Sequence, residues 1–161
     1  MDKIFKRQIR SHDASGQLIE VTLRVLNSQD IKSIIEIAQY SFDKVWSEKD
    51  FQYFISHESG SCWGLFYQDR LIGYFLGLLV LEELDIVSIA VAKEFRRRGA
   101  GESLIKFLWD ILQVKKAFLE VELENRAAIK LYEKSGFSRY GLRRKYYAGK
   151  KDAVLMKREK N

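Results

Sequence analysis

The feature that most constrains the fold is a pair of strand patterns joined by a glycine-containing loop and a single helix. Leu84–Val91 is a short, mostly apolar run of the kind that forms a buried strand. The segment after Gly101 carries apolar residues at helical spacing: Leu104, Leu108, Ile111 and Leu112. Ala117–Leu123 then alternates apolar and polar residues, as a half-buried strand does. Two strands joined in this way lie parallel with a right-handed crossover, so this region predicts a parallel strand pair.

The segments on either side of this crossover predict antiparallel hairpins. Further strand patterns occupy Ile19–Val25, Cys62–Tyr67, Leu71–Leu81, Phe137–Tyr147 and Asp152–Lys157. Two helices are expected after the first of these strands, one with an apolar stripe from Ile31 and one that begins with a Ser47–Asp50 capping box. A short helix between Asn125 and Gly136 precedes the last hairpin. The predicted fold class is α/β, in the form of a mixed α+β sheet that is mostly antiparallel and flanked by helices.

The length of the chain, 161 residues, fits one domain with a core of its own. Residues 1–18 are polar and of mixed charge, so we interpret them as an N-terminal extension and residues 19–161 as a single domain. No apolar run reaches the roughly 18 residues that a membrane span needs. Because the first residues also lack the apolar core of a secretory signal, we expect a cytoplasmic protein that does not act at a membrane.

The few cysteine and histidine side chains exclude two kinds of site. Cys62 is the only cysteine, and His12 and His57 are the only histidines. These three side chains cannot supply the four ligands of a structural zinc site, and one thiol cannot form an internal disulfide. We therefore expect no metal site and interpret Cys62 as a small buried side chain.

The positive charge is concentrated toward the C-terminal end of the chain. The net charge is +6, and residues 139–161 contain nine Lys and Arg residues against two acidic ones. A basic segment of this kind attracts polyanions such as ribosomal RNA, acidic proteins or a phosphorylated cofactor. An equally good interpretation is a solvated edge strand, on which lysines oppose aggregation.

The loop before the central helix has the composition of an anion-binding site. It reads Arg96-Arg-Arg-Gly-Ala-Gly101 and ends at a helix N-terminus, where several backbone N–H groups lack intrahelical partners and the helix dipole is positive. Such a terminus binds phosphate, glycines let the backbone approach the anion closely, and arginines add charge. Gly101 is followed by Glu102-Ser103 rather than by Lys-Ser/Thr, which excludes a P-loop for nucleoside triphosphates.

The same loop resembles the acetyl-coenzyme A (acetyl-CoA) signature of the GCN5-related N-acetyltransferase (GNAT) superfamily. The resembling pattern is Arg96-x-x-Gly99-x-Gly101 after the strand Ile89-Ala-Val91. Further stretches resemble the ribosomal-protein-alanine N-acetyltransferase (RimI) branch: Trp46–Phe51, Leu119–Val121, Asn125–Ile129, Leu131–Glu133, Gly136-Phe137 and Arg143–Tyr147. The resemblance runs from about residue 19 to residue 157. It implies an acyl-CoA N-acyltransferase fold in which one parallel strand pair splays apart.

The resemblance also implies which residues contact the cofactor. Backbone groups of the strand before the loop would bind the pantetheine arm, loop amides would bind the pyrophosphate, and an asparagine would bind the arm near the thioester. The residues so assigned are Ile89, Ala90, Val91, Arg96, Arg97, Arg98, Gly99, Ala100, Gly101, Glu102 and Asn125. Asn125 would then serve both as a helix cap and as a cofactor contact.

Two further residues match the catalytic groups of the family. Glu120 matches its proton acceptor and Tyr132 its proton donor. Without the resemblance, Glu120 would be interpreted as an exposed carboxylate and Tyr132 as a core aromatic side chain. Transfer of acetyl to an amine needs a neutral nucleophile and a proton for the departing thiolate, which these groups would provide. An α-amine, with a pKa of about 7.7–8.0, loses its proton more easily at neutral pH than a lysine, at about 10.4.

The resemblance therefore implies an acetyl-CoA-dependent enzyme that acetylates the N-terminal α-amine of a protein directly, in a ternary complex, with a ribosomal protein as the expected acceptor. The basic C-terminal hairpin would keep such an enzyme near the ribosome. Two alternatives stay open: an acetyltransferase for a polyamine or aminoglycoside, which the acidic residues Glu120, Glu122 and Glu124 would suit, and a non-catalytic module that binds RNA or the ribosome. Glu122 stands where family members commonly carry arginine, which bears on the preferred acceptor.

Overall fold

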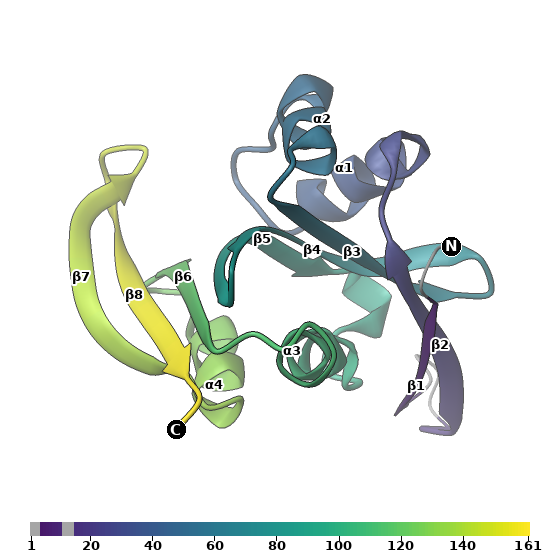
Figure 1. The fold of residues 1–161 in the computed structure, drawn as a ribbon. Coiled ribbons are helices and arrows are strands. Elements are labelled where there is room, and N and C mark those ends of the chain that lie inside the picture. Colours follow the sequence, from purple (N-terminus) through teal and green to yellow (C-terminus); the bar gives the residue numbers. More distant parts are fainter. Residues whose placement is uncertain (1–3, 11–14) are drawn as a thin grey trace.

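The computed structural model describes residues 4–10 and 15–161, and Figure 1 shows its fold. Within these residues one sheet contains eight strands: β1 (Phe5–Arg10), β2 (Leu18–Val25), β3 (Gly60–Tyr67), β4 (Arg70–Val80), β5 (Glu83–Val91), β6 (Lys116–Glu122), β7 (Ser138–Tyr147) and β8 (Lys151–Glu159). The α-helices described are α1 (Ile31–Gln39), α2 (Glu48–Ser56), α3 (Ala100–Asp110) and α4 (Arg126–Lys134). Two short 3-10 helices, η1 (Ser28–Asp30) and η2 (Lys93–Phe95), precede α1 and α3.

The sheet is mixed, and its strands are ordered β1-β2-β3-β4-β5-β6-β8-β7. All neighbouring strands are antiparallel except β5 and β6, which α3 joins, so the predicted parallel pair is confirmed. Helices α1 and α2 cover one face of the sheet and α3 packs against the other, as Figure 1 shows. Because β4 is covered on both faces, its residues from Leu71 to Gly77 are all buried.

The parallel pair of β5 and β6 is hydrogen-bonded over only part of its length. Pairing runs from Glu83 opposite Lys116 to Ile86 opposite Leu119. Beyond these pairs β5 continues along β4 as far as Val91, so the ends of β5 and β6 separate. The splayed parallel pair that the resemblance implies is thus confirmed.

A β-bulge in β5 accompanies the separation. Leu76 of β4 pairs with Ser88, whereas the next residue, Gly77, pairs with Ile86, which leaves Val87 as the extra residue. A Cβ at Gly77 would lie 2.7 Å from a backbone carbonyl oxygen of β5, so this close approach of the strands requires glycine. A bulge bends its strand and increases the local twist, which turns the end of β5 away from β6.

Local capping signals set the predicted helix boundaries. Ser47 and Asp50 form the predicted capping box at the start of α2. The side chain of Asn125 accepts a hydrogen bond from the N–H of Ala128 at 3.2 Å and caps α4. Gly136 follows α4 with a φ of 88°, as expected of a residue that ends a helix. All three boundary predictions are confirmed.

Strand β1 is an addition to the predicted order of elements, since Phe5–Arg10 lies in the segment interpreted as an N-terminal extension. It pairs with β2, from Phe5 opposite Leu23 to Arg10 opposite Leu18. Ile9 is the one fully buried residue of this strand, at 3% exposure, and charged neighbours obscure the alternation that would have indicated a strand. Residues 1–3 and 11–14 of the extension, with His12, lie outside the described part of the chain.

The carboxylate of Asp30 fixes the start of α1 to β2. It accepts hydrogen bonds at 2.9 Å from both terminal nitrogens of Arg24 and from the N–H of Asn27, whose side chain in turn caps η1. Burial by itself raises the pKa of this carboxyl, but the hydrogen bonds from Arg24 and Asn27 outweigh it, so the pKa of Asp30 is lowered. The ionised carboxylate is therefore the form that stabilises the fold.

Asp30→Asn should lower the free energy of unfolding by about 1–3 kcal/mol at pH 7, because the amide has no negative charge and only one acceptor oxygen for the two donors of Arg24. A carboxyl whose pKa is lowered by folding contributes stability that is complete above its unfolded pKa, about 3.9, and is lost as the pH falls through its folded-state pKa. In urea denaturation, the difference in the free energy of unfolding between variant and wild type should stay constant from pH 7 to about 5 and shrink below about pH 4. A difference that grows in acid would contradict this account.

Candidate active site

The separated end of β5 presents backbone groups on the side from which β6 has departed. The N–H of Ala92 donates to the carbonyl oxygen of Ile72 on β4 at 2.8 Å. Because backbone groups alternate sides along a strand, those of Ala90 also face β4, whereas those of Ile89 and Val91 face the open edge. Of the three strand residues assigned to the cofactor, Ile89 and Val91 are therefore the ones whose backbone groups lie on that edge.

Helix α3 begins with a group of unsatisfied backbone donors. Gly99 is its N-cap, with a φ of 94°, a left-handed conformation that glycine adopts without strain. The first intrahelical bond runs from the N–H of Ser103 to the carbonyl oxygen of Gly99 at 2.9 Å. The N–H groups of Ala100, Gly101 and Glu102 precede this bond and have no acceptor inside the helix. They form the positive end of the α3 dipole.

Arg96 has a structural part in the loop between β5 and α3. Its Nε donates to the carbonyl oxygen of Val91 at 3.0 Å. One of its terminal nitrogens donates to the carbonyl oxygen of Tyr40 and to the hydroxyl of Ser41, both at 3.0 Å. These bonds tie the end of β5 to the chain that follows α1, and they direct the guanidinium to protein acceptors. The neighbouring Arg97 is exposed, so its charge is accessible to an anion.

Two contacts bring α3 and α4 together. A Cβ on Gly101 would lie 3.0 Å from Cδ2 of Leu131, so glycine at this position lets the helices approach closely. Glu102 Oε2 lies 3.1 Å from the ammonium nitrogen of Lys134 on α4. The Glu102 carboxylate is thus turned toward a cation, which reduces its repulsion of an anion at the start of α3.

The carboxylates of β6 lie just beyond its last pair with β5, and each has a cationic partner. Glu120 is half-buried, and its Oε1 lies 3.2 Å from a terminal nitrogen of Arg143 on β7. Glu122 Oε1 lies 2.9 Å from the ammonium nitrogen of Lys151, which also lies 3.0 Å from Asp43 in the segment after α1. The β7–β8 hairpin therefore balances much of the negative charge on this face of β6.

Three tyrosines form a chain of interactions from Glu120 to α4. A hydrogen bond to Glu120, together with partial burial, raises the pKa of Tyr146 despite the opposing effect of Arg143. Burial and the charge of Glu120 raise the pKa of Tyr147 to about 12. Tyr132 on α4 is 6% exposed, and burial and the neighbouring Tyr147 raise its pKa as well. All three phenols are protonated at neutral pH, and Tyr147 interacts with both predicted catalytic residues.

Asn125 lies where β6 leads into α4 and keeps hydrogen-bonding capacity. Its backbone N–H donates to the carbonyl oxygen of Glu122 at 2.9 Å, and its Oδ1 caps α4 through Ala128. Because the cap uses the amide oxygen, both N–H donors of the side-chain amide stay available for a further partner.

Asp85 is a carboxylate near Glu120 that the sequence did not indicate. It pairs with Phe118 of β6, so it shares a face of the sheet with Glu120. Partial burial, with the charges of Glu83 and Glu120, raises the pKa of Asp85. The alternation of side chains along β5 and β6 could have placed Asp85 on the same face as Glu120, but only once the register of the two strands is known.

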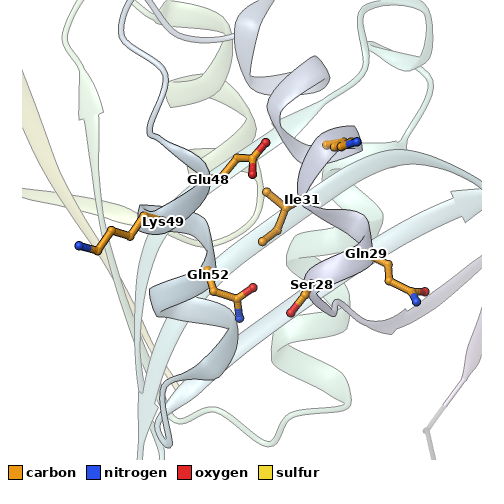
Figure 2. A pocket seen from close by; sticks show the side chains of 7 residues that line it. Ser28, Gln29, Ile31, Glu48, Lys49 and Gln52 are labelled. Atoms are coloured by element: carbon orange, nitrogen blue, oxygen red, sulfur yellow. The ribbon is translucent and has the colours of Figure 1, made fainter.

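The pocket in Figure 2 lies apart from these residues. It is formed at the starts of η1 and α2 by side chains that include Ser28, Gln29, Ile31, Glu48, Lys49 and Gln52. A second hollow is lined by Leu123, Arg126 and other residues around the start of α4. None of the residues assigned to the cofactor or to catalysis lines either hollow. The candidate site is therefore defined by strand edges, a helix terminus and charged side chains.

Comparison with known proteins accounts for this arrangement. The Acetyltransferase (GNAT) family matches residues 31–137. A ribosomal protein bS18 alanine N-acetyltransferase from Salmonella typhimurium is 35% identical over 141 residues, which cover 84% of this chain and 95% of that enzyme. The chain belongs to the GNAT family. It is an N-acetyltransferase, and enzymes of this family take their acyl group from an acyl-CoA.

Two further relatives support membership of the GNAT family. An N-alpha-acetyltransferase from Sulfurisphaera tokodaii is 30% identical over 154 residues, covering 85% of this chain and 92% of that protein. The crystal structure of the ribosomal-protein-S18-alanine N-acetyltransferase from Escherichia coli matches with a TM-score of 0.80 at 32% identity, over 86% of this chain and 93% of that one. The predicted GNAT fold and the resemblance to RimI-type enzymes are both confirmed.

Residues 4–10 and 15–161 hold neither a candidate metal cluster nor a candidate membrane-spanning helix. In this part of the GNAT chain no three His, Cys, Asp or Glu side chains come together as a possible metal site. Among the helices described, none has both the length and the hydropathy for a membrane span.

Arg96→Ala should lower the free energy of unfolding by about 1–3 kcal/mol, because it removes hydrogen bonds that join the loop to β5 and to the segment after α1. Arg97→Ala is the matched control, since it removes the same side chain from the next, exposed position. Urea denaturation at neutral pH measures both. Equal losses in the two variants would show that the Arg96 hydrogen bonds do not stabilise the loop.

Proposed function

We propose that this GNAT enzyme transfers acetyl from acetyl-CoA to the N-terminal α-amine of a protein, and that the acceptor is a ribosomal protein. The observation that carries the proposal is the separation of β5 from β6, which places the open edge of β5 near the positive end of α3 and beside the face that bears Glu120. The 35% identity with the Salmonella typhimurium enzyme supports the choice of acceptor. A cytoplasmic location is part of the same proposal, since the acceptor belongs to the ribosome.

The open edge of β5 fits the pantetheine arm of a CoA thioester. The N–H and C=O groups of Ile89 would bond to the amides of the arm, as a neighbouring strand would, whereas the carbonyl oxygen of Val91 already accepts from Arg96. The free donors of Asn125 would bind the arm near the thioester. By family resemblance, the N–H of Val91 would polarise the thioester carbonyl, and this kind of oriented dipole is a strong source of catalysis.

The start of α3 fits the pyrophosphate. The N–H groups of Ala100, Gly101 and Glu102 lack intrahelical acceptors, and the left-handed Gly99 positions them. Arg97 would add positive charge at this point, with Arg98 beside it. Arg96 would act through its hydrogen bonds within the protein, by keeping the loop in shape. Acetyl-CoA, as a substrate, supplies the activated acetyl group.

Glu120 and Tyr132 would move the protons. With a pKa of about 7.7–8.0, an α-amine needs only a carboxylate acting through water to lose its proton. The amine nitrogen then forms the new bond to the acetyl carbon while the carbon–sulfur bond breaks. Tyr132, whose pKa is raised by burial, would stay protonated, bond to the departing sulfur and pass it a proton that it regains from solvent.

Direct transfer is favoured because the single thiol of the chain is unsuited to carry the acetyl group. Cys62 is buried, and its thiol donates to the backbone carbonyl oxygen of Phe54 at 3.4 Å. Burial raises the pKa of this thiol to about 11, so the nucleophilic thiolate is scarce at neutral pH. An acetyl-enzyme intermediate on Cys62 is therefore disfavoured.

The polyamine alternative depends on an acidic surface for a polycation. Glu120 and Glu122 lie on such a face, but Arg143 and Lys151 pair with them. The local charge balance thus suits an acceptor with one amine at the reacting position better than a polycation. A purely non-catalytic module does not fit a GNAT enzyme.

Association with the ribosome would use the basic end of the β7–β8 hairpin. Arg144, Lys145 and Lys150 are exposed there. Exposed cations of this kind are attracted to the phosphates of RNA, with an affinity that falls as salt rises. This attraction would raise the local concentration of the enzyme near ribosomal acceptors.

A panel of acceptors tests the proposed function directly. In a panel of peptides that begin with the N-terminal residues of ribosomal proteins, the peptide of the acceptor should gain one acetyl group from acetyl-CoA, as measured by intact mass. The same peptides with a blocked N-terminus should gain none, because only their lysine side chains remain. Spermidine is the competing acceptor. Modification of spermidine without modification of any peptide would overturn the proposal.

Glu120→Gln and Tyr132→Phe should each lower kcat by roughly 10²- to 10⁴-fold, the usual contribution of a proton-transfer group. Glu122→Gln is the matched control, since it changes a carboxylate on the same face of β6 that also has a cationic partner. The phenylalanine variant keeps the ring that packs on Phe137 at 5.8 Å between centroids, so its thermal stability should change little. Normal turnover in both variants would refute these assignments.

A further inference from the structure

We propose that β1 is a positioning element for acetyl-CoA, which holds the loop from Arg97 to Gly99 in its cofactor-binding shape through Arg10 and Ile9. The proposal rests on the proposed function in one respect, because it takes this loop as the pyrophosphate site. β1 precedes residues 31–137, which match the GNAT family. This positioning element thus lies outside the part of the chain that matches the family.

A backbone hydrogen bond joins β1 to the loop. The N–H of Arg10 donates to the carbonyl oxygen of Arg98 at 3.0 Å. β1 is the edge strand of the sheet, and the N–H of Arg10 points outward from it, toward the loop and not toward β2. The edge of the sheet thereby holds the carbonyl group that immediately precedes Gly99, the N-cap of α3.

The loop has a backbone conformation that needs outside support. Arg97 has a φ of 60° and Gly99 a φ of 94°. A left-handed conformation in a residue with a side chain is strained, and it persists where the surrounding structure holds it. Arg96 supplies hydrogen bonds on one side of Arg97, and the bond from Arg10 to Arg98 supplies one on the other.

Side-chain packing aligns β1 with the whole length of α3. Ile9 is 3% exposed, and its Cβ lies 4.0 Å from the position that a Cβ on Gly99 would take. The ring of Phe5 lies 5.4 Å from that of Phe107, in the last turns of α3. Arg7 lies 3.8 Å from Asp110, the final residue of α3. Figure 1 shows β1 between β2 and α3, so the strand fixes both ends of this helix.

The position of β1 in the sheet separates its effect from catalysis. β1 forms one edge of the sheet, whereas β6, with Glu120, lies beyond β2, β3, β4 and β5. A disturbance of β1 therefore reaches the start of α3 directly and the proton-transfer groups only through the rest of the sheet. We expect a change in affinity for the cofactor, with kcat at saturating acetyl-CoA and KM for the acceptor preserved.

Arg10→Pro tests the bond, because proline has no N–H. The variant should raise the Kd for CoA, measured by calorimetry, and the KM for acetyl-CoA by roughly three- to tenfold, the range for loss of one hydrogen bond. Hydrogen exchange of the amides of residues 99–103 should be faster than in the wild type. Neither the calorimetric nor the exchange measurement requires acetyl transfer.

Two matched controls separate the bond from general damage to the strand. Gln8→Pro places proline two residues earlier, where the N–H also points to the outer edge but does not bond to Arg98. Arg10→Ala removes the side chain and keeps the N–H. Both controls should bind CoA like the wild type. If thermal unfolding shows that either proline variant is not folded, Ile9→Ala takes the place of Arg10→Pro and should weaken CoA binding through lost packing beneath Gly99.

The outcomes are distinguishable. A folded Arg10→Pro variant with an unchanged Kd for CoA would overturn the role of β1, and so would an equal loss of affinity in Gln8→Pro. A wild-type protein that binds CoA but acetylates no peptide would refute the proposed acceptor while the role of β1 is still decided by the Kd values. A wild-type protein that does not bind CoA would refute both proposals.

Discussion

The structure depends on a strand pair that is prevented from completing its hydrogen bonds. β5 and β6 pair only as far as Ile86 and Leu119, because the bulge at Val87 turns the rest of β5 away. Backbone groups that would otherwise satisfy each other are thereby left for a ligand that can form strand-like bonds. Leaving these backbone groups unpaired costs free energy. This cost is offset by β4, which pairs with the other edge of β5 and is buried between layers of helix.

The charged side chains around this separation are paired with side chains of opposite charge. The acidic face of β6 meets cations from the β7–β8 hairpin, and the start of α3 is kept positive because Glu102 turns to Lys134. The charge of Glu120 raises the pKa of the half-buried Tyr147, and Tyr147 in turn contributes to the raised pKa of Tyr132, so these groups are electrostatically coupled. The same hairpin that balances the carboxylates thus also completes the surroundings of the buried phenol.

Features fixed by neighbouring residues could be predicted from the sequence, whereas those that depend on register or distant contacts could not. The crossover and the caps at Ser47 and Asn125 follow from local patterns, and all are present. β1 escaped prediction because Ile9 is its one fully buried side chain. Arg96 could be placed in a loop signature, but two of its acceptors lie 55 and 56 residues away. Asp85 required the register of β5 and β6, which periodicity alone does not supply.

The close contact between Gly101 and Leu131 has a consequence for the whole site. Gly101 belongs to the helix whose terminus would bind the pyrophosphate, and Leu131 stands next to Tyr132 on the helix that carries the phenol. A larger residue at this crossing would act as a wedge and shift one helix relative to the other. A substitution at Gly101 would therefore displace together the proposed diphosphate site and the proposed proton donor, although the two lie on different helices.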